Sequence, residues 1–189
     1  MIEEKGSVMS NIERDFRTVI ITFSPHGNTR KIAERIHTVF CDEKLDVSFL
    51  DLTGTDMDTF QQFDSLSIPL FDLLIIVSPV YAWKIILPLE LLILNMPAKL
   101  GKCAAVAVTY GGVTSGHALQ NAVRMFTEKG LHTLGALKVV ASHSNVLDEK
   151  KDPFSTHPND ADLEKADEFT YGIIEKMKKC IHYQFPRMD

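Results

Sequence analysis

Short apolar runs typical of buried β-strands alternate with amphipathic, helix-like stretches along most of the chain. Strands are expected at residues 18–23, 45–52, 71–77, 103–109 and 137–141. Helices are expected at residues 28–40, 55–63, 87–95, 115–129 and 161–180, the second of them short. Such alternation is typical of a parallel sheet covered by helices on both faces. The sequence therefore predicts a three-layer α/β fold with a five-stranded parallel sheet.

The 189 residues suffice for about one domain, and no change of composition marks a second one. Residues 1–16 are polar, carry charges of both signs and lack the apolar core of a signal peptide. We therefore expect a flexible tail at 1–16 and a single domain at 17–189. The apolar stretch 85–96 is interrupted by a proline, a glutamate and an asparagine, so no membrane insertion is expected.

The formal net charge of −5 argues against nucleic acid as a partner, because a protein that binds phosphate backbones needs a basic face. The three cysteines, Cys41, Cys103 and Cys180, are widely spaced and form no CxxC pair. This spacing encodes neither a zinc site nor an iron–sulfur cluster, so no metal is expected. Buried thiols in a reducing compartment are the simpler interpretation, and we expect a cytoplasmic protein.

The first expected strand is followed by a turn rich in small polar residues, Ser24-Pro25-His26-Gly27-Asn28-Thr29. A strand–turn–helix junction of this kind exposes backbone N–H groups, adds hydroxyl donors and directs the positive end of a helix dipole at an anion. The turn matches neither the GxGxxG dinucleotide pattern nor the GxxxxGK[ST] pattern of nucleoside triphosphate sites. By itself it is either an ordinary capped turn or a phosphate site without a cation of its own.

Two further strand ends carry aromatic residues and glycines. The third expected strand is followed by Ser78-Pro79-Val80-Tyr81-Ala82-Trp83, and Pro79 is expected to end that strand. The fourth is followed by Thr109-Tyr110-Gly111-Gly112. Aromatic faces stack on flat heterocycles, and paired glycines allow close approach of the backbone to a ligand. Each loop alone is equally an ordinary turn.

The carboxyl ends of parallel strands lie at one edge of a sheet, where ligands bind in open α/β folds. The three loops are therefore expected to meet there. A phosphate nest, aromatic walls and open backbone together predict a site for a mononucleotide with a large planar head group.

These residues resemble the flavodoxin-like family of FMN-binding proteins. The phosphate loop of that family runs Thr/Ser-x-Thr-Gly-Asn-Thr, and residues 24–29 follow it closely. Residues 71–81 and 108–112 are similar to the third and fourth strands of the family with their ring-binding loops, and the match runs from about residue 17 to the end. The Pro-Val-Tyr loop and residues 159–163 most resemble flavodoxin domains fused to a two-cluster ferredoxin domain, whose cysteines are absent here.

The resemblance implies the sheet order 2-1-3-4-5, FMN as the cofactor, and electron transfer as a carrier or a small reductase. It places the FMN phosphate on Ser24, His26, Gly27, Asn28 and Thr29. It places the ring between Pro79, Val80, Tyr81, Ala82 and Trp83 on one side and Thr109, Tyr110, Gly111 and Gly112 on the other. A carrier needs a redox protein partner and a reductase needs a small electron acceptor, and a homodimer is compatible with both. No catalytic residue follows from the resemblance.

Two positions depart from the family pattern. His26 stands where the family usually has Thr, so it either contacts the phosphate or is an exposed side chain that the loop tolerates. The Trp83 loop contains no glycine, whereas relatives often have one, whose peptide turns toward the reduced flavin. A positive φ at Ala82 or Trp83 would cost about 1–2 kcal/mol, so we expect weak stabilisation of the one-electron-reduced flavin. The departures leave open a flavodoxin-like module that has lost FMN and redox activity.

Three other features have less specific interpretations. A phosphoacceptor regulator of this fold would need an aspartate where the chain has Ser78. His117 and His143 lie near expected strand ends and are interpreted as solvated polar residues. The polar loop 142–158 is either a lid or a docking surface.

Overall fold

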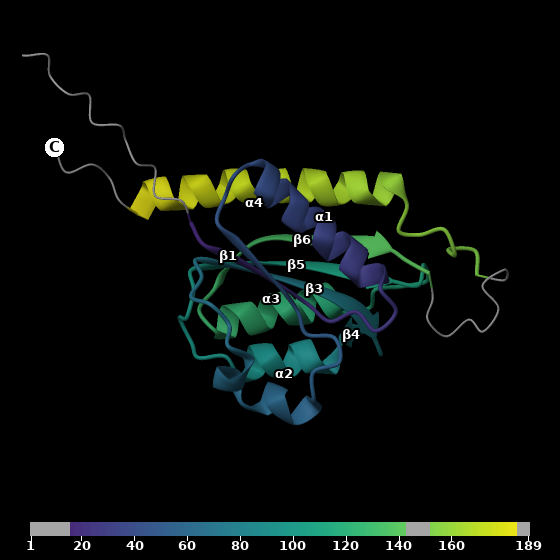
Figure 1. Ribbon diagram of the computed structural model, residues 1–189, viewed down its shortest axis with the longest axis horizontal. Coiled ribbons are helices and arrows are strands. Elements are labelled where there is room, and N and C mark those ends of the chain that lie inside the picture. The colour runs from purple at the N-terminus through teal and green to yellow at the C-terminus, as the bar shows by residue number, and fades with distance from the viewer. Residues whose placement is uncertain (1–15, 143–151, 185–189) are drawn as a thin grey trace, which may run out of the picture.

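The structure is a computed structural model that describes residues 16–142 and 152–184, the last four without their side chains. Its sheet strands are β1 (Thr18–Thr22), β2 (Val47–Asp51), β3 (Leu73–Tyr81), β4 (Lys84–Ile85), β5 (Cys103–Tyr110) and β6 (His132–Val140). Its helices are α1 (Asn28–Asp42), α2 (Leu87–Asn95), α3 (Ala118–Glu128) and α4 (Asp160–Gln184), with 3-10 turns η1 (Met57–Gln61) and η2 (Phe63–Leu66). Figure 1 shows α1 and α4 on one face of the sheet and α2 and α3 on the other.

The strand order is β2-β1-β3-β5-β6, and all these neighbours pair in parallel. The five predicted strands correspond to these five, so the predicted order 2-1-3-4-5 and the three-layer fold are confirmed. Every residue of β1 is buried, and so are the first seven of β5, because helices cover both faces of the central strands. Separate apolar clusters lie on the α1/α4 face and on the α2/α3 face.

Strand β3 continues through Pro79 to Tyr81, so the prediction that Pro79 ends the strand is wrong. The carbonyl of Val77 faces β1, where it accepts a hydrogen bond of 3.0 Å from the Thr22 hydroxyl. The nitrogen of Pro79 faces the same side, because residues two apart in a strand share one neighbour. β1 ends at Thr22, beside Val77, so the missing N–H removes no bond from the sheet. On its other side Pro79 stays in register with Thr109.

Two further differences concern β4, which the sequence pattern did not indicate, and the start of β6, which it placed too late. β4 is a two-residue strand that pairs antiparallel with the end of β3, and it is too short to produce a pattern. β6 begins at His132 rather than at residue 137. It lies at the edge of the sheet, where its first half buries only Leu134 and contains polar residues and a glycine, so it lacks a continuous apolar run.

The structure also corrects the expectation that all three thiols are buried. Cys103 is buried and Cys180 is half-buried, but Cys41 is exposed on α1. Phe16, expected at the end of the tail, is buried edge-on against Phe40, with 6.5 Å between the ring centres. The rest of the expected tail, 1–15, lies outside the described residues.

None of the helices within residues 16–142 and 152–184 combines the length and apolarity needed to cross a membrane. The same residues contain no group of three or more His, Cys, Asp or Glu side chains arranged to hold a metal ion.

Candidate functional site

The ends of β1, β3, β5 and β6 meet at one edge of the sheet and form a pocket there. Its lining joins all three predicted loops, with Ser24, Pro25, His26, Asn28, Thr29, Pro79, Val80, Tyr81, Thr109, Tyr110, Gly111, Ala141 and Ser142. A second pocket adjoins it and is lined by Val80, Ala82, Trp83, Tyr110, Gly111, Val113 and Thr114. The two pockets share three lining residues, Val80, Tyr110 and Gly111, so they lie side by side at the carboxyl edge.

Most of the predicted site residues line one of the two pockets, and Gly27 and Gly112 line neither. The lining also includes residues that the sequence analysis missed, which are Pro25, Val113, Thr114, Ala141 and Ser142. Ala141 and Ser142 follow β6, so the rule that strand ends form the site could have identified them. Val113 and Thr114 directly follow the predicted glycine pair.

The turn before α1 exposes two backbone donors. Gly27 is the N-cap, with φ 82°, and space is open where a Cβ would stand. The N–H of Arg30 is bonded to Ser24 Oγ at 3.0 Å, and the N–H of Lys31 is bonded to the Gly27 carbonyl at 3.2 Å. The N–H groups of Asn28 and Thr29 have no protein acceptor among the described residues, as is usual for the first turn of a helix. These two donors are available to an anion.

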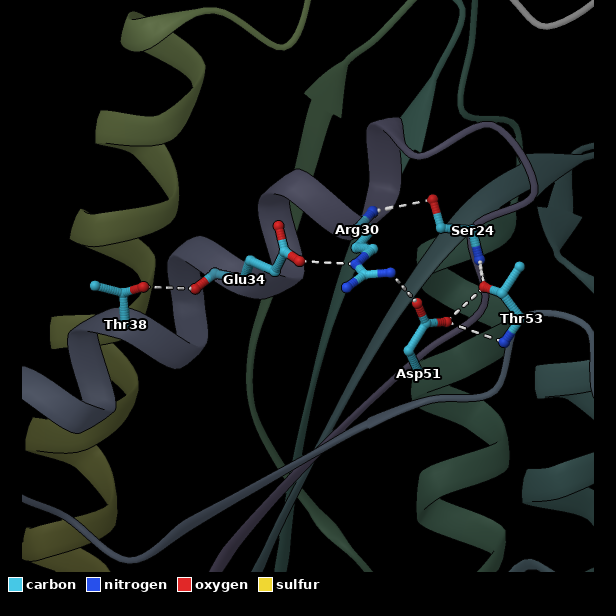
Figure 2. A network of polar contacts seen from close by, with 6 residues as sticks. All are labelled: Ser24, Arg30, Glu34, Thr38, Asp51 and Thr53. Carbon is cyan, nitrogen blue, oxygen red and sulfur yellow. Dashed lines mark hydrogen bonds and ion pairs between the residues drawn. The ribbon is translucent and has the colours of Figure 1, made fainter.

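A polar network holds this turn from the side of β2 (Figure 2). The N–H of Ser24 donates to Thr53 Oγ1 at 2.8 Å, and the hydroxyl and N–H of Thr53 both donate to Asp51. Asp51 also pairs with Arg30, whose guanidinium bonds Glu34 as well. The hydrogen bond that Arg30 donates to Glu34 and the negative charges of Glu34 and Asp51 raise the pKa of Arg30. Arg30 therefore forms ion pairs with two carboxylates of the protein. The hydrogen-bond donors that the turn presents to a ligand are mainly neutral.

A second contact joins the same turn to β5. The hydroxyls of Thr29 and Thr109 lie 2.7 Å apart, and each residue is only 3% exposed. Two hydroxyls that share one hydrogen bond keep one further proton, and both residues line the first pocket. The pair can thus fix the distance between two loops and still donate to a ligand.

The aromatic side of the depression is a tight hairpin between β3 and β4. Its two turn residues, Ala82 and Trp83, have φ values of 46° and 66°. Both residues thus already have the positive φ that was expected to be costly for them, because the two-residue connection between paired strands requires it. The expected weak stabilisation of the one-electron-reduced flavin stays a prediction. The side chain of Trp83 is 66% exposed and that of Tyr81 38%, so both can meet a ligand.

Gly112 has a structural environment that differs from the predicted one. Its φ is 82°, and a Cβ there would stand 1.9 Å from the ring of Phe154. The glycine is therefore needed for close packing of the Phe154 ring on the loop after β5, and it does not line either pocket. The sequence could not indicate this, because the two residues are 42 positions apart, at 112 and 154.

The segment after the undescribed residues 143–151 returns to the β6 side of the site. The Ser142 hydroxyl donates to the buried Asp152 at 2.8 Å, and the Ser142 N–H donates to the His157 carbonyl at 3.0 Å. The part of the expected lid or docking loop at 143–151, with His143, lies outside the described residues.

The two predicted histidines that the structure describes differ in position. His26 is exposed and lines the first pocket. His117 lines neither pocket, and its Nδ1 lies 3.1 Å from Gln120 Oε1.

Asp162 anchors this segment at the start of α4. Its side chain is 1% exposed and contacts Lys165 Nζ at 2.9 Å, the Asn159 N–H at 3.2 Å and His157 Nδ1. Burial acts to raise the pKa of Asp162, but these contacts, led by Lys165, hold it below its ordinary value. Asn159 Oδ1 accepts the Asp162 N–H in return, at 3.2 Å, so Asn159 caps the start of α4.

Solved structures with similar folds cover most of this chain. A flavodoxin from the domain Archaea is 21% identical, with a TM-score of 0.59, over 86% of this chain and 99% of that one. Flavodoxin 2 from Bacillus cereus is 17% identical, with a TM-score of 0.61, over 85% and 99%. An NADH:FMN oxidoreductase, solved in its apo form, is 19% identical, with a TM-score of 0.62, over 87% and 89%. No protein-family model and no curated protein matches the chain. At these identities the likeness establishes the flavodoxin-like fold.

Proposed function

We propose that the protein binds FMN at the carboxyl edge of its sheet and works in electron transfer, as a carrier or a small reductase. The observation that carries this proposal is that the two pockets adjoin each other. One contains free N–H groups at a helix start and the other contains an exposed tryptophan, and they share Val80, Tyr110 and Gly111. A ligand with an anionic end and a flat aromatic end matches that arrangement.

The donor set fits a phosphate. The N–H groups of Asn28 and Thr29, the free proton of the Thr29–Thr109 pair and the α1 dipole all favour an anion. The first turn of α1 contains no acidic residue that would repel it. Open space beside Gly27 leaves room for the phosphate oxygens.

The second pocket fits a flat ring. Trp83, Tyr110 and Gly111 are among the residues that line it. Aromatic residues bind flat rings by offset stacking or by edge contacts, with modest loss of conformational entropy. Bound FMN would supply the redox chemistry, and these residues would bind and orient it and restrict access of water.

The solved structures named above support the same assignment, because two are flavodoxins and one is an NADH:FMN oxidoreductase. Under this proposal the partner is a redox protein or a small electron acceptor, which reaches the flavin beside the exposed Trp83. We place this activity in the cytoplasm, and a homodimer is compatible with it.

A second candidate is a flavodoxin-like module that has lost FMN. The observation in its favour is Arg30, the cation nearest to the turn in sequence, which is paired with Glu34 and Asp51 rather than left for a phosphate. Such a module would keep the fold and bind neither FMN nor riboflavin.

A titration with two flavins separates these candidates. FMN and riboflavin are added to the apo-protein while flavin fluorescence and the emission of Trp83, the only tryptophan, are followed. We expect both flavins to quench Trp83, and FMN to bind more tightly by about tenfold or more, because charge-assisted hydrogen bonds contribute about 1.5–3 kcal/mol. Absence of quenching together with absence of co-elution on a sizing column contradicts FMN binding. Equal affinities contradict the phosphate site but leave a ring site.

A further inference from the structure

The hairpin that carries Trp83 adopts a conformation that its own residues disfavour. Tyr81 of β3 pairs with Lys84 of β4, so Ala82 and Trp83 form a two-residue turn. Both have positive φ, 46° and 66°, as the type I′ turns of such hairpins require. Glycine and asparagine favour these positions, whereas alanine and tryptophan resist them. Contacts outside the hairpin must therefore stabilise the turn.

The segment just before α3 supplies those contacts. The N–H of His117 donates a hydrogen bond of 3.0 Å to the carbonyl of Trp83. Gly116, with φ 53°, lies so close that a Cβ there would stand 2.3 Å from Trp83 Cβ and 2.8 Å from its Cα. Because those are a Cβ and a backbone atom rather than the end of a flexible side chain, only a glycine allows this approach. The N–H of Gly116 is itself bonded to Thr114 Oγ1 at 3.0 Å.

The base of the same hairpin is fixed as well. Ser78, which is fully buried, accepts the N–H of Ile86 on its hydroxyl at 3.0 Å. The hairpin is thus held at its base by Ser78 and at its tip by residues 116 and 117, while the indole itself is 66% exposed. A fixed backbone with an exposed aromatic side chain is a preformed wall for a ligand, which lowers the entropy cost of binding.

We propose that Gly116 and the backbone N–H of His117 are positioning residues for Trp83. They hold the Ala82–Trp83 turn in its left-handed conformation and thereby place the indole beside the second pocket, which residues 113 and 114 of the same segment also line. The placement of Trp83 does not depend on the identity of the ligand. Its consequence for flavin affinity rests on the proposed function.

The test is Gly116→Ala, with Gly54→Ala as the matched control. Gly54 also has a positive φ, 83°, but has open space where its Cβ would stand, so it shares the backbone penalty without the clash. In the apo-protein, Gly116→Ala is expected to change the emission maximum of Trp83 and its quenching by acrylamide, and Gly54→Ala to leave both unchanged. Wild-type values in a folded Gly116→Ala protein would overturn the proposal.

The flavin affinities add a separate readout. Gly116→Ala is expected to weaken the binding of FMN and of riboflavin by the same factor, about tenfold. The change disturbs the position of Trp83 and leaves residues 24–29, the proposed phosphate turn, intact. A loss confined to FMN would overturn the proposal, since it would locate the effect at the phosphate. If wild-type protein binds neither flavin but Trp83 still responds to Gly116→Ala, the proposed function fails and the positioning role stands.

Hydrogen exchange on wild-type apo-protein tests the proposal even if Gly116→Ala does not fold. The amide of His117 is expected to exchange more slowly than those of Asn28 and Thr29, which also lie at a helix start but have no acceptor among the described residues. Exchange of the His117 amide as fast as those two would contradict its bond to the Trp83 carbonyl. His117→Ala, which keeps the backbone N–H, is expected to leave the emission of Trp83 unchanged.

Discussion

The hydroxyl groups of Thr29 and Thr109 lie 2.7 Å apart in a buried position, although the two residues are 80 positions apart in the chain. Thr29 belongs to the first turn of α1 and Thr109 to the end of β5. Their hydrogen bond ties the turn before α1 to the end of β5, and both residues line the first pocket.

This bond can be tested with a double-mutant cycle. Thr29→Val and Thr109→Val are each expected to lower the free energy of unfolding by about 1–3 kcal/mol, because each leaves a buried hydroxyl without a partner. The double variant should lose less than the sum, since it removes both polar groups. Urea denaturation measures all four proteins. Simple additivity of the two losses would show that the hydroxyls do not interact.

The conformation of Gly27 predicts a second effect. Gly27→Ala is expected to destabilise the protein by about 1–2 kcal/mol, because alanine resists the φ of 82° at this position. Gly54→Ala, with φ 83°, should cost a similar amount. Only the change at Gly27 should weaken FMN binding, because Gly27 is the N-cap of α1, next to the N–H groups of Asn28 and Thr29, and Gly54 is not part of that turn. Equal losses of FMN affinity in the two variants would mean that the effect acts through global stability.

Asp51 and Glu34 both pair with Arg30, but only Asp51 also accepts hydrogen bonds from Thr53, which holds Ser24. Asp51→Ala is therefore expected to loosen the phosphate turn and weaken FMN binding by about fivefold to thirtyfold, which corresponds to about 1–2 kcal/mol. Glu34→Ala breaks a solvent-exposed ion pair, which contributes little to stability in water, and should leave the Kd unchanged. The two Kd values come from flavin fluorescence titrations. A matching effect in Glu34→Ala would assign the role to Arg30 instead.

The pKa of Asp162 predicts a dependence of stability on pH. Its folded-state pKa lies below that of the unfolded chain, about 3.9, so its ionised form stabilises the fold at higher pH. This contribution is lost as the pH falls through the folded-state value. Asp162→Asn should therefore be less stable than wild type by about 1–3 kcal/mol at pH 7, and the difference should shrink below pH of about 4. Urea denaturation across this range measures it, and a constant difference would contradict the assignment. Asp160 is exposed, so Asp160→Asn serves as the control and is expected to show no such dependence on pH.

Cys41 and Cys103 should differ in their reactivity toward thiol reagents. Burial, together with the neighbouring Cys180 thiol, raises the pKa of Cys103 to about 12, so almost no thiolate forms at neutral pH. Cys41 is exposed on α1. Iodoacetamide is expected to label Cys41 in the native protein and Cys103 only after unfolding, as peptide mass spectrometry would show. Labelling of Cys103 at the same rate as Cys41 would mean that β5 opens readily.

The order of strands and helices was predictable from the chain because the buried central strands and the amphipathic helices have distinct periods. The bounds of α2 were predicted at 87–95 and are observed there. The pattern failed where burial is one-sided or the element is very short. β6 buries few of its side chains at the edge of the sheet, and β4 has only two residues.

The candidate site divides in the same way. Its location followed from sequence, because small polar and aromatic residues stand directly after strands whose carboxyl ends must share one edge. The contacts that shape it did not, since they join residues such as Thr29 with Thr109, Gly112 with Phe154 and Gly116 with Trp83.

The amino-acid sequence by itself determined the parallel sheet and the edge at which a ligand would bind, since these depend on local patterns of apolar and turn-forming residues. The order of the strands in the sheet was implied by the resemblance to flavodoxin-like proteins. Tertiary structure alone decided which glycines face the site and which allow packing. It also decided that Ala82 and Trp83 adopt left-handed backbone angles, because the penalty of that turn is offset by the distant N–H of His117 and by the absence of a side chain at Gly116.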